Sequence, residues 1–199
     1  MGVSDGARTR PGARSGARDA ALIASFAGLI AVLGLPGALV LFGSAVPLTL
    51  QTLGVMLAGS ILGPRRAMAS VAVFLLLVAL GLPLLAGGRG GLAVFVGPSA
   101  GYLIGWIAGA GVIGWLVHRR LPAYPLWWGA LANIIGGIGV VYAVGIPVQA
   151  FVTGTTGLVA TAVAATVYLP GDLIKVVIAT GTAAAVHRAY PELLVGARS

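Results

Sequence analysis

Residues 65–86 read RRAMASVAVFLLLVALGLPLLA, in which two arginines are followed by 20 residues without a charged side chain. A membrane-spanning helix needs about 20 mostly apolar residues, so this stretch predicts such a helix with a basic boundary. The whole chain of 199 residues has the same character: 59% of it is hydrophobic and 8% is charged, against about a quarter charged in soluble domains. We therefore exclude a soluble domain and expect an integral membrane protein. Because the chain has no cysteine, disulfides and thiolate metal sites are excluded as well.

Five further apolar segments give the chain its predicted organisation: 20–41, Val46–Gly63, Ser99–Val117, Leu126–Ala143 and Gly171–Arg188. We predict an all-α integral membrane protein with six transmembrane helices in one bundle. A flexible basic tail at 1–19 precedes the membrane domain at 20–190, and a short tail follows at 191–199. The stretch Val144–Pro170 is uncharged and contains an apolar piece that is too short to span. We expect it to form an outer connection that packs on, or dips into, the helix bundle, since exposed irregular backbone is not tolerated at membrane depth.

Basic residues mark every second connection, in addition to the tail: Arg65, Arg66, His118, Arg119, Arg120, His187 and Arg188. Positively charged residues collect on the cytoplasmic side of membrane helices, so both termini are predicted to be cytoplasmic. Trp115, Trp127 and Trp128 fall near the same boundary, as in an aromatic belt. The net charge of +8 therefore reflects membrane topology rather than nucleic-acid binding.

Asp172 and Lys175 form a charged pair at the start of the last predicted segment. Residues three apart share a helix face, so a structural interpretation is that Asp172 caps the helix and pairs with Lys175. The functional interpretation is that the pair binds a ligand, because ionisable groups inside a membrane are costly and usually mark a site. The carboxylate would accept ligand N–H groups and the ammonium would donate to a carbonyl.

Arg89 departs from the inner-side charge pattern, because it lies among four glycines on a loop predicted to face outside. It is either a solvated loop residue or an anchor for a carboxylate, which a guanidinium can bind with two hydrogen bonds. Gln51 and Tyr102 would lie at the same outer side as Arg89 and Asp172, and this convergence suits capture of a small amphipathic molecule. Asn133 is a further candidate, although alone it could simply bridge two helices.

A stripe of small residues runs along the first predicted helix: Ala20, Ala24, Ala27, Gly28 and Ala31. Small residues at three- and four-residue spacing allow another helix to approach closely. The stripe therefore predicts either packing within the bundle or docking of a partner subunit.

Enzymatic chemistry is not expected from this sequence. The single lysine, Lys175, follows Ile174, so the Gly-Lys-Ser/Thr core of an ATP-binding P-loop is absent. His118 and His187 have no further ligand at metal-binding spacing, and no nucleophile elbow occurs. We predict no catalytic residue, metal or cofactor. A self-sufficient carrier coupled to ions or protons, with Asp172 as the proton site, is the alternative function.

Several motifs resemble the BioY family, the biotin-specific substrate-capture (S) components of energy-coupling factor (ECF) transporters. They are VPLTLQTLGV at 46–55, GPRR at 63–66, GLP at 81–83, AGG at 86–88, GPSAGYLIG at 97–105 and LPGDLIK at 169–175. The family usually has Gly-Pro-Thr-Gly-Gly-Tyr at the fifth motif, and the resemblance covers about residues 20–190.

The resemblance implies a multi-pass protein of a bacterial or archaeal cell membrane, with a biotin pocket near the outer face. It implies that Asp172 and Lys175 bind the ureido ring of biotin, while an outer arginine, here Arg89, meets the valerate carboxylate. It also implies three partner chains, namely a transmembrane coupling subunit (T component) and two ABC-type ATPases. The small-residue stripe would be the docking surface for the T component.

Overall fold

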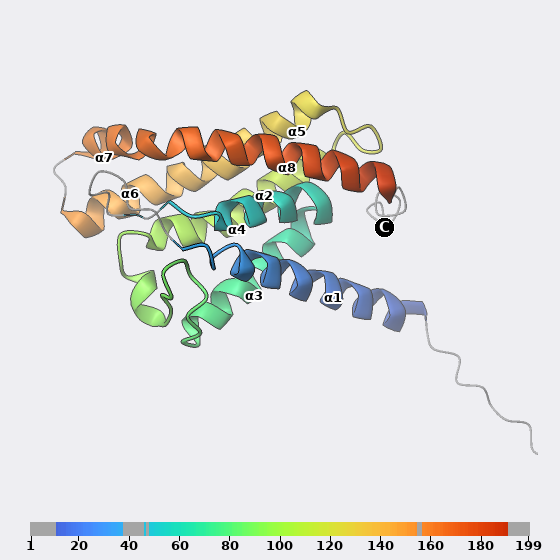
Figure 1. Cartoon of the computed structure of the whole chain (residues 1–199), viewed down its shortest axis with the longest axis horizontal. Helices are drawn as coiled ribbons and strands as arrows, with labels where there is room; N and C mark the ends of the chain where they lie inside the picture. The colour runs from blue at the N-terminus through green and yellow to red at the C-terminus, as the bar shows by residue number, and fades with distance from the viewer. Residues whose placement is uncertain (1–10, 38–45, 47, 155–156, 191–199) are drawn as a thin grey trace, which may run out of the picture.

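The computed structural model describes residues 11–37, 46, 48–154 and 157–190, and all of its elements are helical (Figure 1). They are α1 (Pro11–Val32), α2 (Gln51–Leu62), α3 (Pro64–Ala79), η1 (Leu92–Phe95), α4 (Ala100–His118), α5 (Leu126–Asn133), η2 (Ile134–Val140), α6 (Val141–Thr153), α7 (Leu158–Ala165), η3 (Thr166–Tyr168) and α8 (Leu169–Ala189). The prediction of an all-helical chain is confirmed.

The described residues make six helical rods, because several elements follow one another without a break. The π-helical η2 joins α5 to α6 in one helix of 28 residues, and η3 joins α7 to α8 in one of 32 residues. With α4, these are the three described helices that are long and apolar enough to cross a membrane. Helix α2 is apolar but has only 12 residues, which corresponds to about 18 Å at 1.5 Å per residue.

The prediction that Val144–Pro170 is an outer connection is wrong. Helix α6 continues to Thr153, and a new helix begins at Leu158 and runs into α8. Pro147 lies inside α6, and Pro170 is tolerated because it stands in the first turn of α8. The helix is interrupted near Gly154, whose φ of +63° is a left-handed conformation that glycine adopts at low cost.

Other helix boundaries also differ from the predicted ones. Helix α1 begins at Pro11, so residues 11–19 of the expected tail are helical, and Asp19 in this part forms a 2.8 Å ion pair with Arg66 of α3. The first predicted helix reaches 41, whereas α1 ends at Val32. The last part of that predicted helix, from 38 on, lies outside the described residues. The same holds for residues 1–10 of the first predicted tail and for the second tail at 191–199. Helix α3 starts at Pro64 and stops at Ala79 rather than Ala86, shortly before Gly81 with its φ of +100°.

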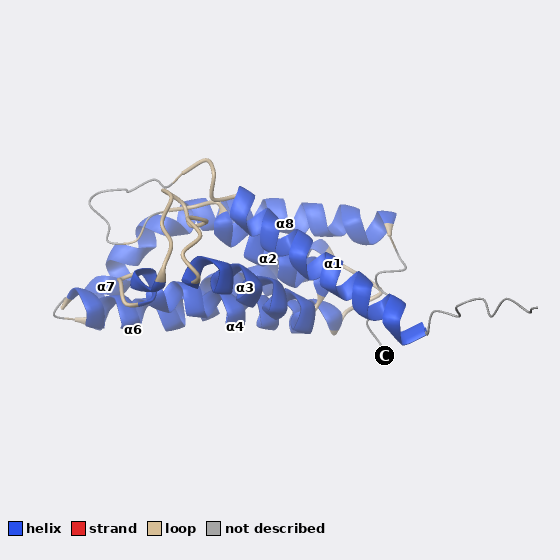
Figure 2. Ribbon diagram, turned by 90° about the horizontal axis from the view of Figure 1, so that it is seen from below, coloured by secondary structure: helices blue, strands red, loops and turns tan. Residues whose placement is uncertain are grey.

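Helix α4 lies at the centre of the bundle, where it packs against α2, α3, α5 and α6, while α1 covers α2 and α3. Glycines permit this close packing: a Cβ on Gly109 of α4 would lie 2.6 Å from the carbonyl oxygen of Gly136 in η2. The helices run mainly along the long axis of the molecule (Figure 2). The N-terminal end of α1 and the C-terminal end of α8 lie at the same end of the bundle in both views.

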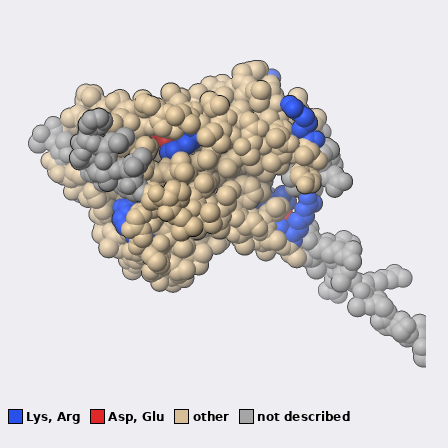
Figure 3. All heavy atoms as spheres, in the orientation of Figure 1, with Lys and Arg blue, Asp and Glu red and all other residues tan. Residues whose placement is uncertain are grey.

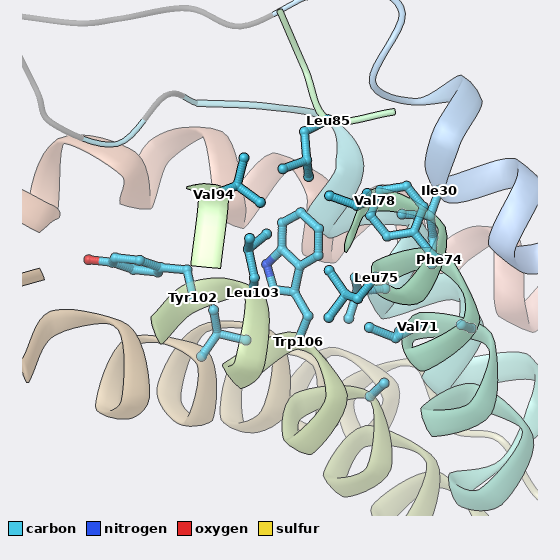
Figure 4. Close-up of a cluster of buried hydrophobic side chains, with 14 of the residues drawn as sticks. Ile30, Val71, Phe74, Leu75, Val78, Leu85, Val94, Tyr102, Leu103 and Trp106 are labelled. Carbon is cyan, nitrogen blue, oxygen red and sulfur yellow. The ribbon is translucent and has the colours of Figure 1, made fainter. Parts of the chain in front are cut away.

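A cluster of buried apolar side chains fixes Trp106 of α4 between α3 and the loop that follows α3 (Figure 4). Phe74 of α3 lies 6.3 Å from it, measured between ring centroids, and Leu85 and Val94 approach from the loop. Trp106 also lines the cavity described below, so this apolar cluster supports one wall of the candidate site.

Candidate functional site

A cavity of about 420 Å³, open mouth included, lies between α2, α4, η2, α6 and α8. Its wall is mostly apolar or aromatic, with a few polar groups: Val46, Leu48, Thr49, Thr52, Tyr102, Trp106, Gly137, Val141, Tyr142, Tyr168, Asp172 and Lys175. Such a wall suits a ligand with an apolar body and a small polar group.

The charged pair of the cavity, Asp172 and Lys175, is buried and hydrogen-bonded to neighbouring side chains. The Lys175 ammonium donates to Asp172 Oδ1 and to Thr52 Oγ1, each at 2.8 Å. Tyr142 Oη donates to Asp172 Oδ2 at 2.7 Å. Asp172 and Lys175 are 5% and 4% exposed, so each charge depends on these partners rather than on water.

The helix that carries this pair differs from the predicted one. Asp172 lies in the first turn of α8, as predicted, but α8 continues directly from α7 and η3, so Asp172 also lies 14 residues after Leu158 in one continuous helical rod. The 3-10 turn η3 places Tyr168 just before it, and Tyr168 Oη donates to the carbonyl oxygen of Val46 at 2.8 Å. Asp172 is therefore held by tertiary partners, and helix capping is not its main role.

The pair retains hydrogen-bonding capacity for a ligand. An ammonium has three donors, of which Lys175 uses two, and a carboxylate has about four acceptor sites, of which Asp172 uses two. One ligand acceptor and up to two ligand donors can thus be added without breaking a bond. A cyclic urea or amide offers this combination of N–H and C=O groups.

Tyrosines form the aromatic part of the wall. Tyr102, near the start of α4 as predicted, packs edge-on against Tyr142 with ring centroids 6.1 Å apart. Its hydroxyl donates to Gln149 Oε1 at 2.7 Å, which ties α4 to α6. Gly145 makes room for this ring, since a Cβ there would lie 2.4 Å from Tyr102 Cδ1.

Gln51 does not line the cavity, although we predicted it as a ligand-binding residue. It is 1% exposed, and its side-chain amide donates to the carbonyl oxygens of Ile30 and Leu84 at 3.3 and 3.0 Å. Its Oε1 accepts from the Ala86 amide at 3.1 Å. Gln51 therefore connects α1, α2 and the loop after α3, next to the cavity residue Thr52.

Asn133 lies away from the cavity as well. Its amide donates to Ser60 Oγ, to the Gly129 carbonyl and to Thr180 Oγ1, at 3.0, 2.9 and 3.4 Å. The structural alternative that the sequence left open, a bridge between helices, describes Asn133 correctly: it joins α5 to α2 and α8.

Arg89 lies in a tight turn after α3 and is not among the residues that line the cavity. The turn is closed by the Leu85 amide, which donates to the Arg89 carbonyl at 3.0 Å, and Arg89 Nε donates to the Ala86 carbonyl at 3.4 Å. Its guanidinium is half-buried and makes no ion pair with a described acid.

The small-residue stripe is divided between two environments. Ala20, Ala24 and Gly28 are exposed at four-residue spacing, and a Cβ on Gly28 would meet no atom within 4 Å. Ala31 is half-buried, and Ala27 is 4% exposed because it faces the core of the bundle. Ala27 therefore packs within the bundle, which is one of the two interpretations that the sequence left open for the stripe.

Thr52, Trp106, Tyr142 and Tyr168 were not among the predicted site residues. A tyrosine in an apolar helix is usually read as an interfacial residue, so Tyr142 and Tyr168 carry no distinctive local signal. The available signal was that the hydroxyl groups of Thr52 and Tyr142 lie towards the predicted outer ends of their own helices, on the same side as Asp172 and Tyr102.

A bundle of long apolar helices around one buried charged cavity defines a membrane protein with a small-molecule site. The chain belongs to the BioY family, whose model matches residues 7–192. It is 46% identical over 181 residues to "Biotin transporter BioY" of Rhizobium etli, covering 88% of this chain and 96% of that protein. A "Probable biotin transporter BioY" of Bacillus subtilis is 51% identical over 77% of this chain and 81% of its own length.

The fold is also similar to a solved structure, the crystal structure of the S-component for biotin from an ECF-type ABC transporter. The TM-score is 0.83 at 29% sequence identity, and the match covers 88% of this chain and 93% of the other.

Proposed function

We propose that this chain is the biotin-capturing S component of an ECF-type biotin uptake transporter and not an enzyme. Membership of the BioY family and the similarity to a biotin S-component support this function. The observation that carries the proposal in the structure is the buried Asp172–Lys175 pair, which keeps one donor and two acceptor sites available in a mostly apolar and aromatic cavity.

The chemistry of biotin matches this cavity. Its ureido ring has two N–H donors and one carbonyl acceptor, which pair with the Asp172 carboxylate and the third N–H of Lys175. The apolar thiophane ring would lie among the rings of Trp106 and Tyr142. Each ligand hydrogen bond to a charged group contributes about 1.5–3 kcal/mol, so this arrangement supports high affinity.

Arg89 remains the proposed partner of the biotin carboxylate. It lies on the loop between α3 and α4 and is half-buried without an acidic partner among the described residues. Since it does not line the cavity in this structure, the proposal requires the loop to bring the guanidinium and the valerate tail together.

The proposed topology has six membrane helices, with the cavity towards the outside and both termini in the cytoplasm. Figure 3 supports it: most blue atoms on this face lie at the end of the bundle where α1 begins and α8 ends. Positively charged residues favour the cytoplasmic side. No cofactor is proposed, and biotin is the ligand.

Energy for uptake would come from a T component and two ABC-type ATPases. The exposed line of Ala20, Ala24 and Gly28 is the proposed docking surface for the T component, because it allows a second helix to approach closely. The alternative of a self-sufficient ion- or proton-coupled carrier was motivated by the lone acid in the membrane and by the missing ATPase motif. Asp172 is instead paired with Lys175, which removes the first of these supports.

Equilibrium binding of biotin to the purified protein tests the proposal. Wild type should bind tightly, whereas Asp172→Asn and Lys175→Ala should each lose binding because one ligand contact disappears and the remaining partner is left unpaired. Thr180→Val is a matched control, since Thr180 is buried in the same helix but contacts Asn133 and not the cavity. Unchanged binding in both site variants would contradict the site, and weak binding by wild type would contradict the function.

A further inference from the structure

Two arginines in the turn between α4 and α5 are each held over a tryptophan ring. The Arg119 guanidinium carbon lies 3.6 Å from the centre of the Trp115 ring. The Arg120 guanidinium carbon lies 4.8 Å from the centre of Trp128 and 5.8 Å from that of Trp127. Stacking on an aromatic face fixes a guanidinium while its N–H groups, which lie in its plane, stay free to donate.

These two charges are exposed and have no acidic partner among the described residues. The ion pairs in the described part of the chain join Arg66 to Asp19 and Lys175 to Asp172. Arg119 and Arg120, adjacent in sequence and both exposed, thus present two positive charges whose guanidinium N–H groups make no hydrogen bond or ion pair with a described residue. A guanidinium binds a phosphate group, like a carboxylate, through two parallel N–H···O hydrogen bonds.

The tryptophans beside the arginines are also exposed, with 49% of Trp115 and 60% of Trp127 accessible. Trp128 is fixed by a 2.8 Å hydrogen bond from its Nε1 to the Leu116 carbonyl, and its ring meets Trp127 edge-on at 5.5 Å. Leu126, 56% exposed, extends the apolar surface. Tryptophan prefers the headgroup level of a membrane, so the basic groups and the apolar surface together match an amphipathic ligand rather than a free ion.

We propose that Arg119 and Arg120, stacked on Trp115, Trp127 and Trp128, bind the phosphate headgroup of an anionic phospholipid in the inner leaflet. Blue atoms gather at the end of the molecule where the α4–α5 turn lies (Figure 3). The site is separate from the small-residue face of α1, because α1 packs against α2 and α3 whereas α5 packs against α4 and α8. Lipid and partner subunit can therefore bind at the same time.

Tryptophan fluorescence in vesicles tests this proposal, because three of the four tryptophans lie at the site and Trp106 is buried elsewhere. The protein is reconstituted in phosphatidylcholine that contains a small fraction of phosphatidylglycerol brominated on its acyl chains. Brominated phosphatidylcholine at the same fraction is the comparison. One basic residue near the surface raises the preference for anionic lipid about fivefold, so two should give about 30-fold, seen as stronger quenching by the anionic lipid.

The double variant Arg119→Gln/Arg120→Gln should reduce this preference towards that of a neutral surface. Arg65→Gln/Arg188→Gln is the matched control: it removes the same charge from exposed arginines that are not stacked on a tryptophan, and it should keep most of the preference. If the glutamine variant fails to fold, Arg119→Lys/Arg120→Lys replaces it, and a lysine pair should retain only the part of the preference that is due to charge.

Several results would overturn the proposal. The first is a negative quenching result, either equal quenching by the two brominated lipids in wild type or the same loss of preference in the site variant and the control. The second is removal of the preference by excess inorganic phosphate, which would assign the site to a free anion. The third is an unchanged lipid preference in the site variant together with weaker capture of the T component, which would assign the surface to a protein partner.

Discussion

The substitution Gln51→Leu tests whether Gln51 binds the ligand or instead stabilises the fold. In wild type, the Gln51 side chain makes three hydrogen bonds to main-chain groups of α1 and of the loop after α3. Leucine has a similar size but cannot hydrogen-bond, so the buried Ala86 N–H and the Leu84 carbonyl lose this partner. No other polar group can take the place of the Gln51 amide, because the surroundings are tightly packed. A Cβ on Gly34 would lie only 2.9 Å from Gln51 Nε2.

The expected cost follows from those unpaired groups. Each buried polar group without a partner costs about 1–3 kcal/mol, which gives roughly 2–6 kcal/mol for two of them. At about 2–4 °C per kcal/mol for a chain of this size, Gln51→Leu should lower the melting temperature by about 10 °C without biotin. Biotin should still raise the melting temperature of the variant, because the Asp172–Lys175 pair is intact.

Thermal unfolding of the purified protein in detergent, with and without biotin, measures both effects. Gln149→Leu is the matched control, since it removes one hydrogen bond, from Tyr102, rather than three, and should lower the melting temperature less. Suppose instead that the Gln51→Leu variant melts like wild type without biotin but is no longer stabilised by biotin. Gln51 would then be a biotin-binding residue, and its assignment to the fold would be refuted.

Three further predictions concern the cavity, the packing of α4 and the face of α1. Tyr142→Phe removes a donor to the Asp172 carboxylate, so calorimetric titration should show biotin affinity reduced about tenfold, and unchanged affinity would contradict this role. Gly114→Ala should destabilise the protein by about 1–3 kcal/mol because its Cβ would lie 2.5 Å from the Pro64 nitrogen, while Gly28→Ala, with open space, should not; equal melting temperatures would refute the packing argument. Ala24→Trp should abolish co-purification with the T component but leave biotin binding intact, and retained co-purification would exclude this docking face.

Fold class could be predicted from the sequence because hydropathy is a property of consecutive residues. A chain with 8% charge must place most of its surface in lipid, and lipid requires backbone hydrogen bonds within each segment. The ends of the last two long helices were misplaced because Pro147 and Pro170 indicate breaks locally, yet Pro147 lies inside α6 and Pro170 stands in the first turn of α8. Local signals therefore predicted that helices occur but placed their ends wrongly.

The sequence by itself determined that this is a helical membrane protein whose Asp172 and Lys175 share one helix face, because composition and three-residue spacing are local properties. Only the tertiary structure decided which other polar residues join them. Thr52 and Tyr142 lie 123 and 30 residues from their partners in sequence, and their hydroxyls complete the pair. Gln51 and Asn133 were also candidates for the site, but packing turned their amides towards main-chain groups and other helices. A side-chain amide bonds whichever buried group the fold brings within reach, and the sequence does not encode that distance locally.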